Sequence, residues 1–167
     1  MRKKQIGFEI KSLADCPRYA AICAHWAYGE WFAARDIPFD VNLLAYEKRA
    51  RGEGLPTTFV AISDTLPVGM ATLKQTELWK LPNVAPWLSA LYVLPAYRKQ
   101  GVGARLINAV KANAARWGFD SLHLFLGQSE ATLAEYYENL GWQFFCDAED
   151  NDGFTTKVYK ILLEKSC

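Results

Sequence analysis

The stretch APWLSALYVLPAYRKQGVGARL, residues 85–106, decides the fold of this chain. Residues 85–95 are apolar enough to form a central strand, and a turn with two glycines, Gly101 and Gly103, follows. An amphipathic pattern then predicts a helix from about Gly103 to Trp117. Its buried stripe is expected to consist of Leu106, Val110, Ala114 and Trp117. Because the run SLHLFL (121–126) reads as the next strand, these elements predict a βαβ crossover with two parallel strands.

The residues before this stretch predict a strand, two helices and a hairpin. The expected elements are a strand at 8–13, a helix from near Pro17 to about Phe32, a helix ending at Gly52, and strands TTFVAIS (57–63) and VGMATLK (68–74). Asp15 and Asp40 are candidate N-caps, because aspartate accepts hydrogen bonds from the first N–H groups of a helix. The connection DTLP is typical of a turn, so the two strands should be antiparallel.

The residues after it predict a helix and two closing strands. A helix is expected at 130–140, with Leu133, Tyr136, Tyr137 and Leu140 at helical spacing. WQFFC (142–146) and TTKVYKILL (155–163) read as strands, separated by the acidic loop DAEDNDG. The predicted order is β-α-α-β-β-β-α-β-α-β-β. It indicates a mixed α/β (α+β) fold: one domain over residues 1–167, a mostly antiparallel sheet of about seven strands, and helices on both faces.

Composition excludes several classes of protein. The 167 residues are 51% hydrophobic and 22% charged, with a formal net charge of +1, so no overall field recruits nucleic acid or membrane. No apolar run is long enough for a membrane span, and the N-terminus MRKKQIGFEIKSLAD lacks the apolar region of a signal peptide. We therefore expect a cytoplasmic protein. The four cysteines, at positions 16, 23, 146 and 167, are expected to be reduced thiols, and the two histidines suggest no metal site.

The glycine turn is suited to an anion such as a pyrophosphate. The first N–H groups of a helix have no internal partner, the helix dipole is positive there, and Arg98 and Lys99 add charge. A Walker loop is excluded because no Gly-Lys-Ser/Thr follows. The dinucleotide pattern GxGxxG fails because position 106 is leucine. A turn that binds no ligand stays open as an alternative.

Two motifs resemble one family. R-x-x-G-x-G, with Arg98, Gly101 and Gly103 after LSALYVLPAY, resembles the acetyl-CoA-binding motif of the GNAT superfamily of N-acetyltransferases. AEYYENLGWQFF (134–145) resembles the family's L-Y-x-x-x-G-F element, with Tyr137 on its tyrosine and Trp142 on its aromatic residue. The two lie in the family's order and at a suitable spacing. The resemblance covers most of residues 57–163, which would form the acetyl-CoA-binding core, and it implies transfer of an acetyl group to an amine.

The resemblance also implies roles for particular residues. Main-chain groups of Leu91, Tyr92 and Val93 would pair with the pantetheine arm, as an added strand would. The pyrophosphate would be bound by Arg98, Lys99, Gln100, Gly101, Val102, Gly103 and Ala104. Tyr137 would be the general acid that protonates the departing thiolate, with a core aromatic as the alternative role and Tyr136 as its rival.

Two departures from the family pattern stand out. Glu130 occupies the position where many relatives place an asparagine that contacts CoA, and Gln128 or Ser129 could substitute for that contact. Some relatives carry a glutamate base on the strand before the glycine turn, whereas WLSALYV contains no acid. The base must then come from elsewhere, and Glu30, Glu77 and His25 are the candidates.

The acceptor is expected to be a small-molecule amine or a peptide. In the family, the first two helices and the loop before the fourth strand border the acceptor, and these segments contribute Glu30, Trp31, Glu77 and Trp79. Aromatic walls with a few carboxylates suit a cationic amine. A homodimer through an exposed last strand is left open. The alternative function is a catalytically silent acyl-CoA-binding module or sensor.

Overall fold

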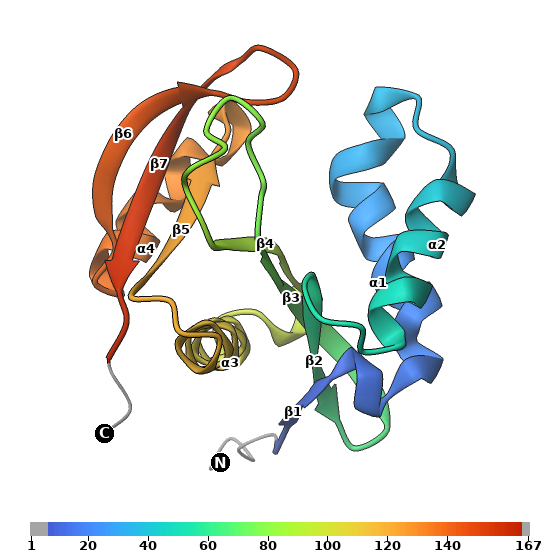
Figure 1. The fold of residues 1–167 in the computed structure, drawn as a ribbon. Helices are drawn as coiled ribbons and strands as arrows, with labels where there is room; N and C mark the ends of the chain where they lie inside the picture. Colours follow the sequence, from blue (N-terminus) through green and yellow to red (C-terminus); the bar gives the residue numbers. More distant parts are fainter. Residues whose placement is uncertain (1–6, 165–167) are drawn as a thin grey trace. The chain divides into compact units, whose positions relative to one another are not determined.

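The structure is a computed structural model that describes residues 7–164. The MRKK tail and Cys167, considered above, lie outside the described residues. The described strands form one sheet in the order β1-β2-β3-β4-β5-β7-β6 (Figure 1). They are β1 (Glu9–Ser12), β2 (Thr57–Ser63), β3 (Leu66–Lys74), β4 (Trp87–Val93), β5 (Ser121–Leu126), β6 (Gln143–Glu149) and β7 (Thr155–Leu162). The helices are α1 (Ala20–Ala27), α2 (Phe39–Ala50), α3 (Val102–Arg116) and α4 (Ala134–Asn139). The element order is the one predicted.

Strand pairing confirms the predicted crossover. β4 and β5 are parallel, with Trp87 opposite His123, and α3 connects them. β1 pairs antiparallel with β2, and β7 pairs antiparallel with both β5 and β6. Neighbouring β2 and β3 are joined by two residues only, Asp64 and Thr65, and a connection that short requires antiparallel strands.

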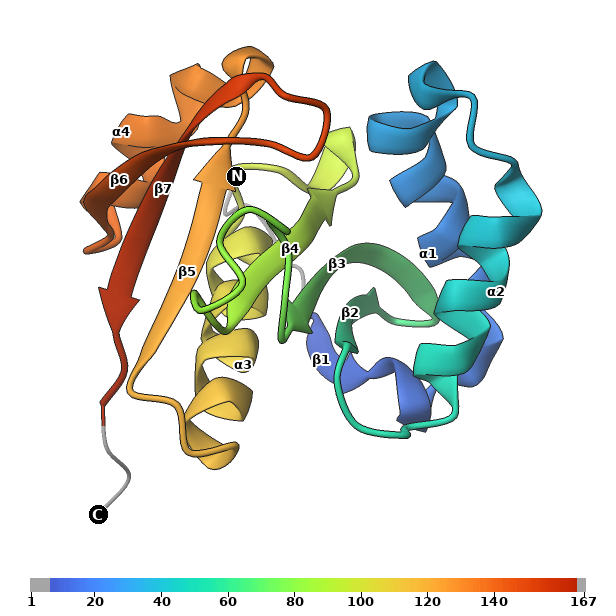
Figure 2. The ribbon, with the colours of Figure 1, turned by 45° about the horizontal axis from the view of Figure 1, so that its top comes forward.

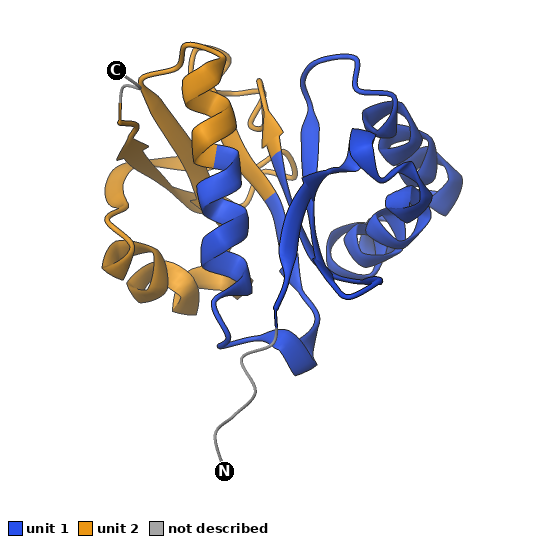
Figure 3. Cartoon of the chain, turned by 90° about the horizontal axis from the view of Figure 1, so that it is seen from below, with its two compact units in different colours: residues 1–72, 90–110 blue, residues 73–89, 111–167 orange. Residues whose placement is uncertain are grey.

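The described residues divide into two compact units (Figure 3). One contains residues up to 72 together with 90–110, and the other contains 73–89 and the residues from 111 onward. β3, β4 and α3 each begin in one unit and end in the other.

The first unit is built around the packing of α1 on α2, which lie side by side in Figures 1 and 2. The Asn42 side chain of α2 donates to the backbone carbonyl of Ala24 in α1, so the two helices are joined by a buried polar bond as well as by apolar contacts. Tyr46 of α2 is 1% exposed and packs in the same core as Leu13, Cys23, Val60, Ile62 and Met70.

The second unit has its own apolar core. Leu78, Trp87 and Val158 are each 0% exposed and form one cluster. Leu122 and Leu124 of β5 and Trp142 before β6 are also buried. Figure 2 shows β7 between β5 and β6, so the last strand is an interior strand and β6 forms one edge of the sheet. The last strand, which the sequence left open as a possible exposed edge for a dimer, is therefore paired on both sides.

Neither predicted aspartate cap is found. Ser12 caps a 3₁₀ turn at Leu13–Asp15, its hydroxyl accepting from the Ala14 N–H at 3.3 Å, and α1 begins only after a second 3₁₀ turn. α2 begins after Pro38, which places Asp40 inside the first turn, where its side chain accepts from the adjacent Val41 N–H. The first helix does continue to Phe32, but through a π-helical turn, Tyr28–Phe32.

Two buried stripes differ from prediction. In α3, Leu106, Val110 and Ala114 are buried as expected, but Trp117 is 53% exposed because the helix ends at Arg116. Val102 and Ile107 of α3, which were not predicted as part of the stripe, are also buried. The predicted helix at 130–140 is a 3₁₀ turn, Gln128–Leu133, followed by α4, and of its four stripe residues only Tyr137 is buried. β6 also extends through Glu149, so the first three residues of the predicted acidic loop belong to a strand.

Candidate functional site

The turn between β4 and α3 presents free backbone N–H groups at a helix start. The first helical bond runs from the Arg105 N–H to the Gly101 carbonyl, so the N–H groups of residues 102–104 have no acceptor within the helix. Lys99 (φ 59°) and Gly101 (φ 84°) are both left-handed. Left-handed residues alternating with right-handed ones turn successive N–H groups toward one side, which favours an anion.

Two polar side chains of this turn donate hydrogen bonds to nearby backbone carbonyl groups. Arg98 donates its Nε–H to the Val93 carbonyl at 2.8 Å, and its guanidinium lies 5.7 Å from the centre of the Tyr92 ring. Gln100 donates to the carbonyl of Ala96 at 2.8 Å. The sequence predicted Arg98 and Gln100 as ligands of an anion. In the structure, both side chains also hydrogen-bond to nearby carbonyl groups, which fixes the shape of the turn.

β4 itself contains a strained residue. Ala90 lies in the middle of the strand with φ 51°, a conformation that costs a non-glycine residue about 1–2 kcal/mol. Such a residue kinks the strand and changes the direction of the backbone groups that follow, here those of Leu91, Tyr92 and Val93. β4 and β5 pair with Trp87, the first residue of β4, opposite His123.

Gly69 is a residue of this region that the sequence analysis missed. A Cβ at Gly69 would lie 2.8 Å from the Tyr92 carbonyl oxygen and within 3.3 Å of the side chains of Leu106 and Val93. Only glycine therefore allows β3 to approach the end of β4 this closely. The available signal was a glycine inside the strand pattern VGMATLK, which often marks a close backbone approach.

Tyr137 lies in the second unit and is 6% exposed. Its ring makes edge-to-face contacts with Tyr136 (centroids 5.2 Å apart) and Trp142 (6.0 Å). Burial raises the pKa of the Tyr137 phenol well above its usual value, and Tyr136 and Glu130 raise it further. The hydroxyl has no hydrogen-bond partner among residues 7–164. Because its pKa is raised, the phenol is protonated at neutral pH.

Glu130 is directed to its own turn. Its carboxylate accepts from the Gly127 N–H at 3.3 Å, while its N–H donates to the Gly127 carbonyl at 2.9 Å. The glutamate thus closes the start of the 3₁₀ turn Gln128–Leu133. This local bond gives the Glu130 side chain a structural role in its own turn.

The predicted acceptor residues fall into two pairs. Glu30 and Trp31 share the π-helical turn of the first unit, where Glu30 is exposed and Trp31 packs partly against the core. Glu77 and Trp79 share the loop between β3 and β4 in the second unit. The Glu77 carboxylate lies 3.1 Å from the Lys74 ammonium, whereas Trp79 is 68% exposed. His25, the third candidate base, is exposed on α1.

The described cysteines and metal-binding side chains form no disulfide and no metal site among residues 7–164. Cys16, Cys23 and Cys146 are free thiols. Between residues 7 and 164 no three side chains of the metal-binding types gather to hold an ion. No helix in that range has the length and hydropathy needed to cross a membrane.

Comparison with known proteins identifies the family. Residues 54–144 match the family model described as acetyltransferase (GNAT) domain. Because the match covers more than half of the chain, the chain belongs to the GNAT acetyltransferases, and the predicted family is confirmed. No curated protein sequence matches the chain.

Solved structures share the fold at low sequence identity. The yncA protein of Salmonella typhimurium, solved with its cofactor acetyl-CoA, is 18% identical, with 96% of each chain covered and a TM-score of 0.67. A GNAT-family protein from Desulfovibrio desulfuricans is 16% identical over 95% of this chain and 100% of its own, with a TM-score of 0.73. An aminoglycoside 6′-N-acetyltransferase complexed with coenzyme A is 16% identical over 95% and 99%, with a TM-score of 0.72. These likenesses confirm the predicted fold class.

Proposed function

We propose that the protein is an N-acetyltransferase that transfers the acetyl group of acetyl-CoA to the primary amine of a small molecule or peptide. The observation that carries the proposal is the β4–α3 turn, with its left-handed Lys99 and Gly101 and the unpaired N–H groups at the start of α3. Acetyl-CoA bound to a protein of the same fold supports it.

Binding of the cosubstrate would use mainly backbone groups. The pyrophosphate would accept hydrogen bonds from the N–H groups of residues 101–104, while Lys99 adds an exposed positive charge. Leu91, Tyr92 and Val93 would pair with the pantetheine arm beyond the kink at Ala90. Arg98 would act mainly by holding the Val93 carbonyl, so that strand and turn keep a fixed geometry.

The chemistry is a direct attack. The amine nitrogen bonds to the acetyl carbonyl carbon, the charge that develops on the carbonyl oxygen is stabilised by the Val93 N–H, and the C–S bond then breaks. Tyr137 gives its phenolic proton to the departing thiolate, which its burial-raised pKa supports because the phenol is neutral before the reaction.

The attacking nitrogen must first lose a proton. β4 contains no acid, and the Glu77 carboxylate is engaged by Lys74. The exposed His25 and Glu30 are the remaining candidates, and we assign the proton transfer to one of them acting through water.

Thermal unfolding with acetyl-CoA, CoA, NADH and ATP in separate samples tests the binding step. A ligand that binds only the native state adds about 2.7 kcal/mol at a hundredfold excess over its Kd. Stabilisation by the two CoA species alone, followed by amine-dependent thiol release, is the expected result. Stabilisation without thiol release for any amine would instead support a silent acyl-CoA-binding module, and no stabilisation would overturn the proposal.

A further inference from the structure

Tyr92 is a residue of β4 whose ring contacts both α1 and the glycine turn. The ring lies 5.4 Å from the Trp26 indole of α1, between centroids, at an interplanar angle of 35°. The Arg98 guanidinium lies 5.7 Å from the centre of the same ring. Both separations fall within the ranges at which aromatic pairs and cation–π pairs attract. All three residues belong to the first unit, and Trp26 is buried, so the ring is held by a side chain of the core.

The backbone on either side of Val93 is fixed against β3. The Leu94 N–H donates to the Val68 carbonyl of β3 at 2.9 Å. The Tyr92 carbonyl oxygen faces Gly69 of β3, where an added Cβ would lie only 2.8 Å from it. Backbone groups of β4 that point toward β3 are therefore closely packed and have little room to turn.

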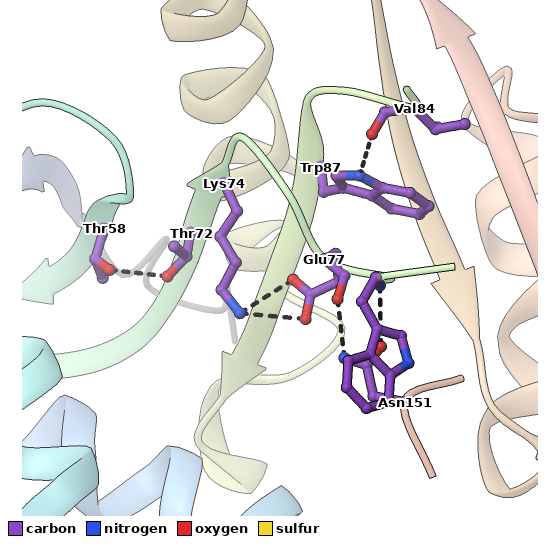
Figure 4. A network of polar contacts seen from close by, with 8 residues as sticks. Thr58, Thr72, Lys74, Glu77, Val84, Trp87 and Asn151 are labelled. Atoms are coloured by element: carbon purple, nitrogen blue, oxygen red, sulfur yellow. Dashed lines mark hydrogen bonds and ion pairs between the residues drawn. The ribbon is translucent and has the colours of Figure 1, made fainter. Parts of the chain in front are cut away.

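β3 is in turn held to β2 by a buried pair of hydroxyl groups. Thr58 of β2 and Thr72 of β3 are both buried, and their hydroxyl oxygens are 2.8 Å apart (Figure 4). Breaking this hydrogen bond would leave two polar groups unpaired away from water, so the bond is retained. β3 is therefore a firm support for the end of β4.

These contacts determine the direction of the Val93 N–H. Successive residues of a strand direct their backbone groups to alternate edges. Tyr92 and Leu94 direct theirs to β3, so Val93 directs its N–H and its carbonyl to the other edge of β4, where the carbonyl accepts from Arg98 Nε at 2.8 Å. The Tyr92 carbonyl and the Val93 N–H belong to one planar peptide group, so contacts that fix Tyr92 also fix this N–H.

We propose that Tyr92 is a positioning residue for the oxyanion donor: its ring, held by Trp26 and Arg98, keeps the Val93 N–H directed at the acetyl carbonyl oxygen. This inference rests on the proposed function, which assigns stabilisation of the developing charge to that N–H. A donor that is already oriented costs no reorganisation during the reaction, so a ring that restricts this peptide group lowers the barrier. Tyr92 acts through Val93, and its effect is on kcat.

The test removes the ring from the full-length protein. Tyr92→Leu deletes the contacts with Trp26 and Arg98, whereas Tyr92→Phe keeps the ring and deletes a hydroxyl that makes no hydrogen bond within the described part of the chain. Tyr19→Leu is the matched control. Tyr19 is a tyrosine of the same unit with an arginine of its own, since the Arg18 guanidinium lies 4.6 Å from the centre of its ring.

Steady-state kinetics should separate these variants. In Tyr92→Leu, kcat should fall about tenfold, part of the roughly hundredfold or greater loss that removal of an oxyanion donor causes. The KM for acetyl-CoA should change little, because the Arg98 bond to the Val93 carbonyl remains. Tyr92→Phe and Tyr19→Leu should keep the wild-type kcat. Trp26→Phe retains an aromatic ring in the core and is a milder second variant, which should lower kcat in the same direction.

The carbonyl stretching frequency of bound, isotope-labelled acetyl-CoA is a readout that needs neither acceptor nor turnover. A hydrogen bond from the Val93 N–H lowers this frequency in the wild type, in Tyr92→Phe and in Tyr19→Leu, and the lowering should be smaller in Tyr92→Leu and Trp26→Phe. Wild-type kcat in Tyr92→Leu, full lowering of the frequency in that variant, or a Tyr92→Phe as impaired as Tyr92→Leu would overturn this inference while acetyl transfer still stands. Failure of the wild type to bind acetyl-CoA would overturn the proposed function and the inference together.

Discussion

Arg98 donates its Nε–H to the carbonyl of Val93 across 2.8 Å, which joins the start of the glycine turn to the last residue of β4. Lysine cannot reproduce this bond while keeping its charge in the same place, because it lacks the planar fork of the guanidinium. We expect Arg98→Lys to raise the KM for acetyl-CoA about tenfold, in line with loss of one hydrogen bond from a charged group. Steady-state kinetics measures this, with Arg116→Lys at the other end of α3 as the control. Equal KM values for Arg98→Lys and the wild type would contradict the bracing role.

Gly101→Ala isolates the left-handed backbone of the turn. A Cβ at Gly101 would meet no atom within 4 Å, so the cost arises from φ 84° alone. We expect a loss of about 1–2 kcal/mol in the free energy of unfolding and weaker binding of acetyl-CoA. The matched control is Gly29→Ala, also free of contacts and without a positive φ, which should be neutral or stabilising. Denaturant unfolding compares the two, and equal effects would remove the conformational argument.

Gly69→Ala tests the close approach of β3 to β4, whereas Gly101→Ala tests a left-handed backbone conformation. Its Cβ would lie 2.8 Å from the Tyr92 carbonyl oxygen, and that backbone atom cannot move away easily. Overpacking of this kind typically costs about 1–3 kcal/mol, so the midpoint of thermal unfolding should fall. Since the displaced atom lies on β4, the KM for acetyl-CoA should rise as well. A variant as stable as the wild type would show that β3 and β4 are less closely packed.

Tyr137→Phe removes only the phenolic hydroxyl. We expect kcat to fall about a hundredfold or more, as for loss of a general acid, with little change in the KM for acetyl-CoA. Tyr136→Phe is the control, because this neighbouring ring is 40% exposed and has no assigned proton transfer. An unchanged kcat in Tyr137→Phe would remove this residue from the mechanism and leave it as a core aromatic.

His123 makes the stability of the protein depend on pH. The side chain is 5% exposed, and burial together with the nearby Lys160 lowers its pKa below the usual value. The unfolded chain then binds more protons than the folded one below about pH 6.5, so acidification through the folded-state pKa reduces stability. Urea unfolding between about pH 5 and 7.5 should show this loss in the wild type and in His25→Gln, whose histidine 123 is intact. His123→Gln should lose less stability on acidification, and an equal loss would exclude His123 as the source.

The sequence predicted the elements whose residue patterns are strongly periodic. SLHLFL and TTFVAIS become β5 and β2 with unchanged bounds, because both are short apolar runs between turn residues. The helix ends were harder to predict. Asp15 and Asp40 looked like caps, but a 3₁₀ turn capped by Ser12 takes up Asp15 and α2 already begins after Pro38, so single-residue preferences did not locate the helix starts.

Only those residues of the candidate site that belong to a short sequence motif could be predicted from the sequence. The glycine turn and Tyr137 each lie within one short segment that resembles a family motif, so both could be proposed as site residues from the sequence. Ala90, Gly69 and the ring contacts of Tyr92 depend on which segments meet in three dimensions, and no local pattern reports that. Alanine is an unusual residue for φ 51°, and Trp26, the α1 partner of Tyr92, looks like an ordinary core residue of a helix.

The sheet order has a consequence for biosynthesis. β6 joins the sheet only through β7, yet β7 is the later of the two along the chain. While the ribosome extends the chain at about 5–20 residues per second, β6 and its aromatic pair Phe144 and Phe145 must wait without a neighbour strand. Release of β7 from the exit tunnel then allows the β6–β7 hairpin to dock on β5 as one piece. A premature stop before residue 155 would therefore leave β6 without any neighbouring strand and β5 paired with β4 alone.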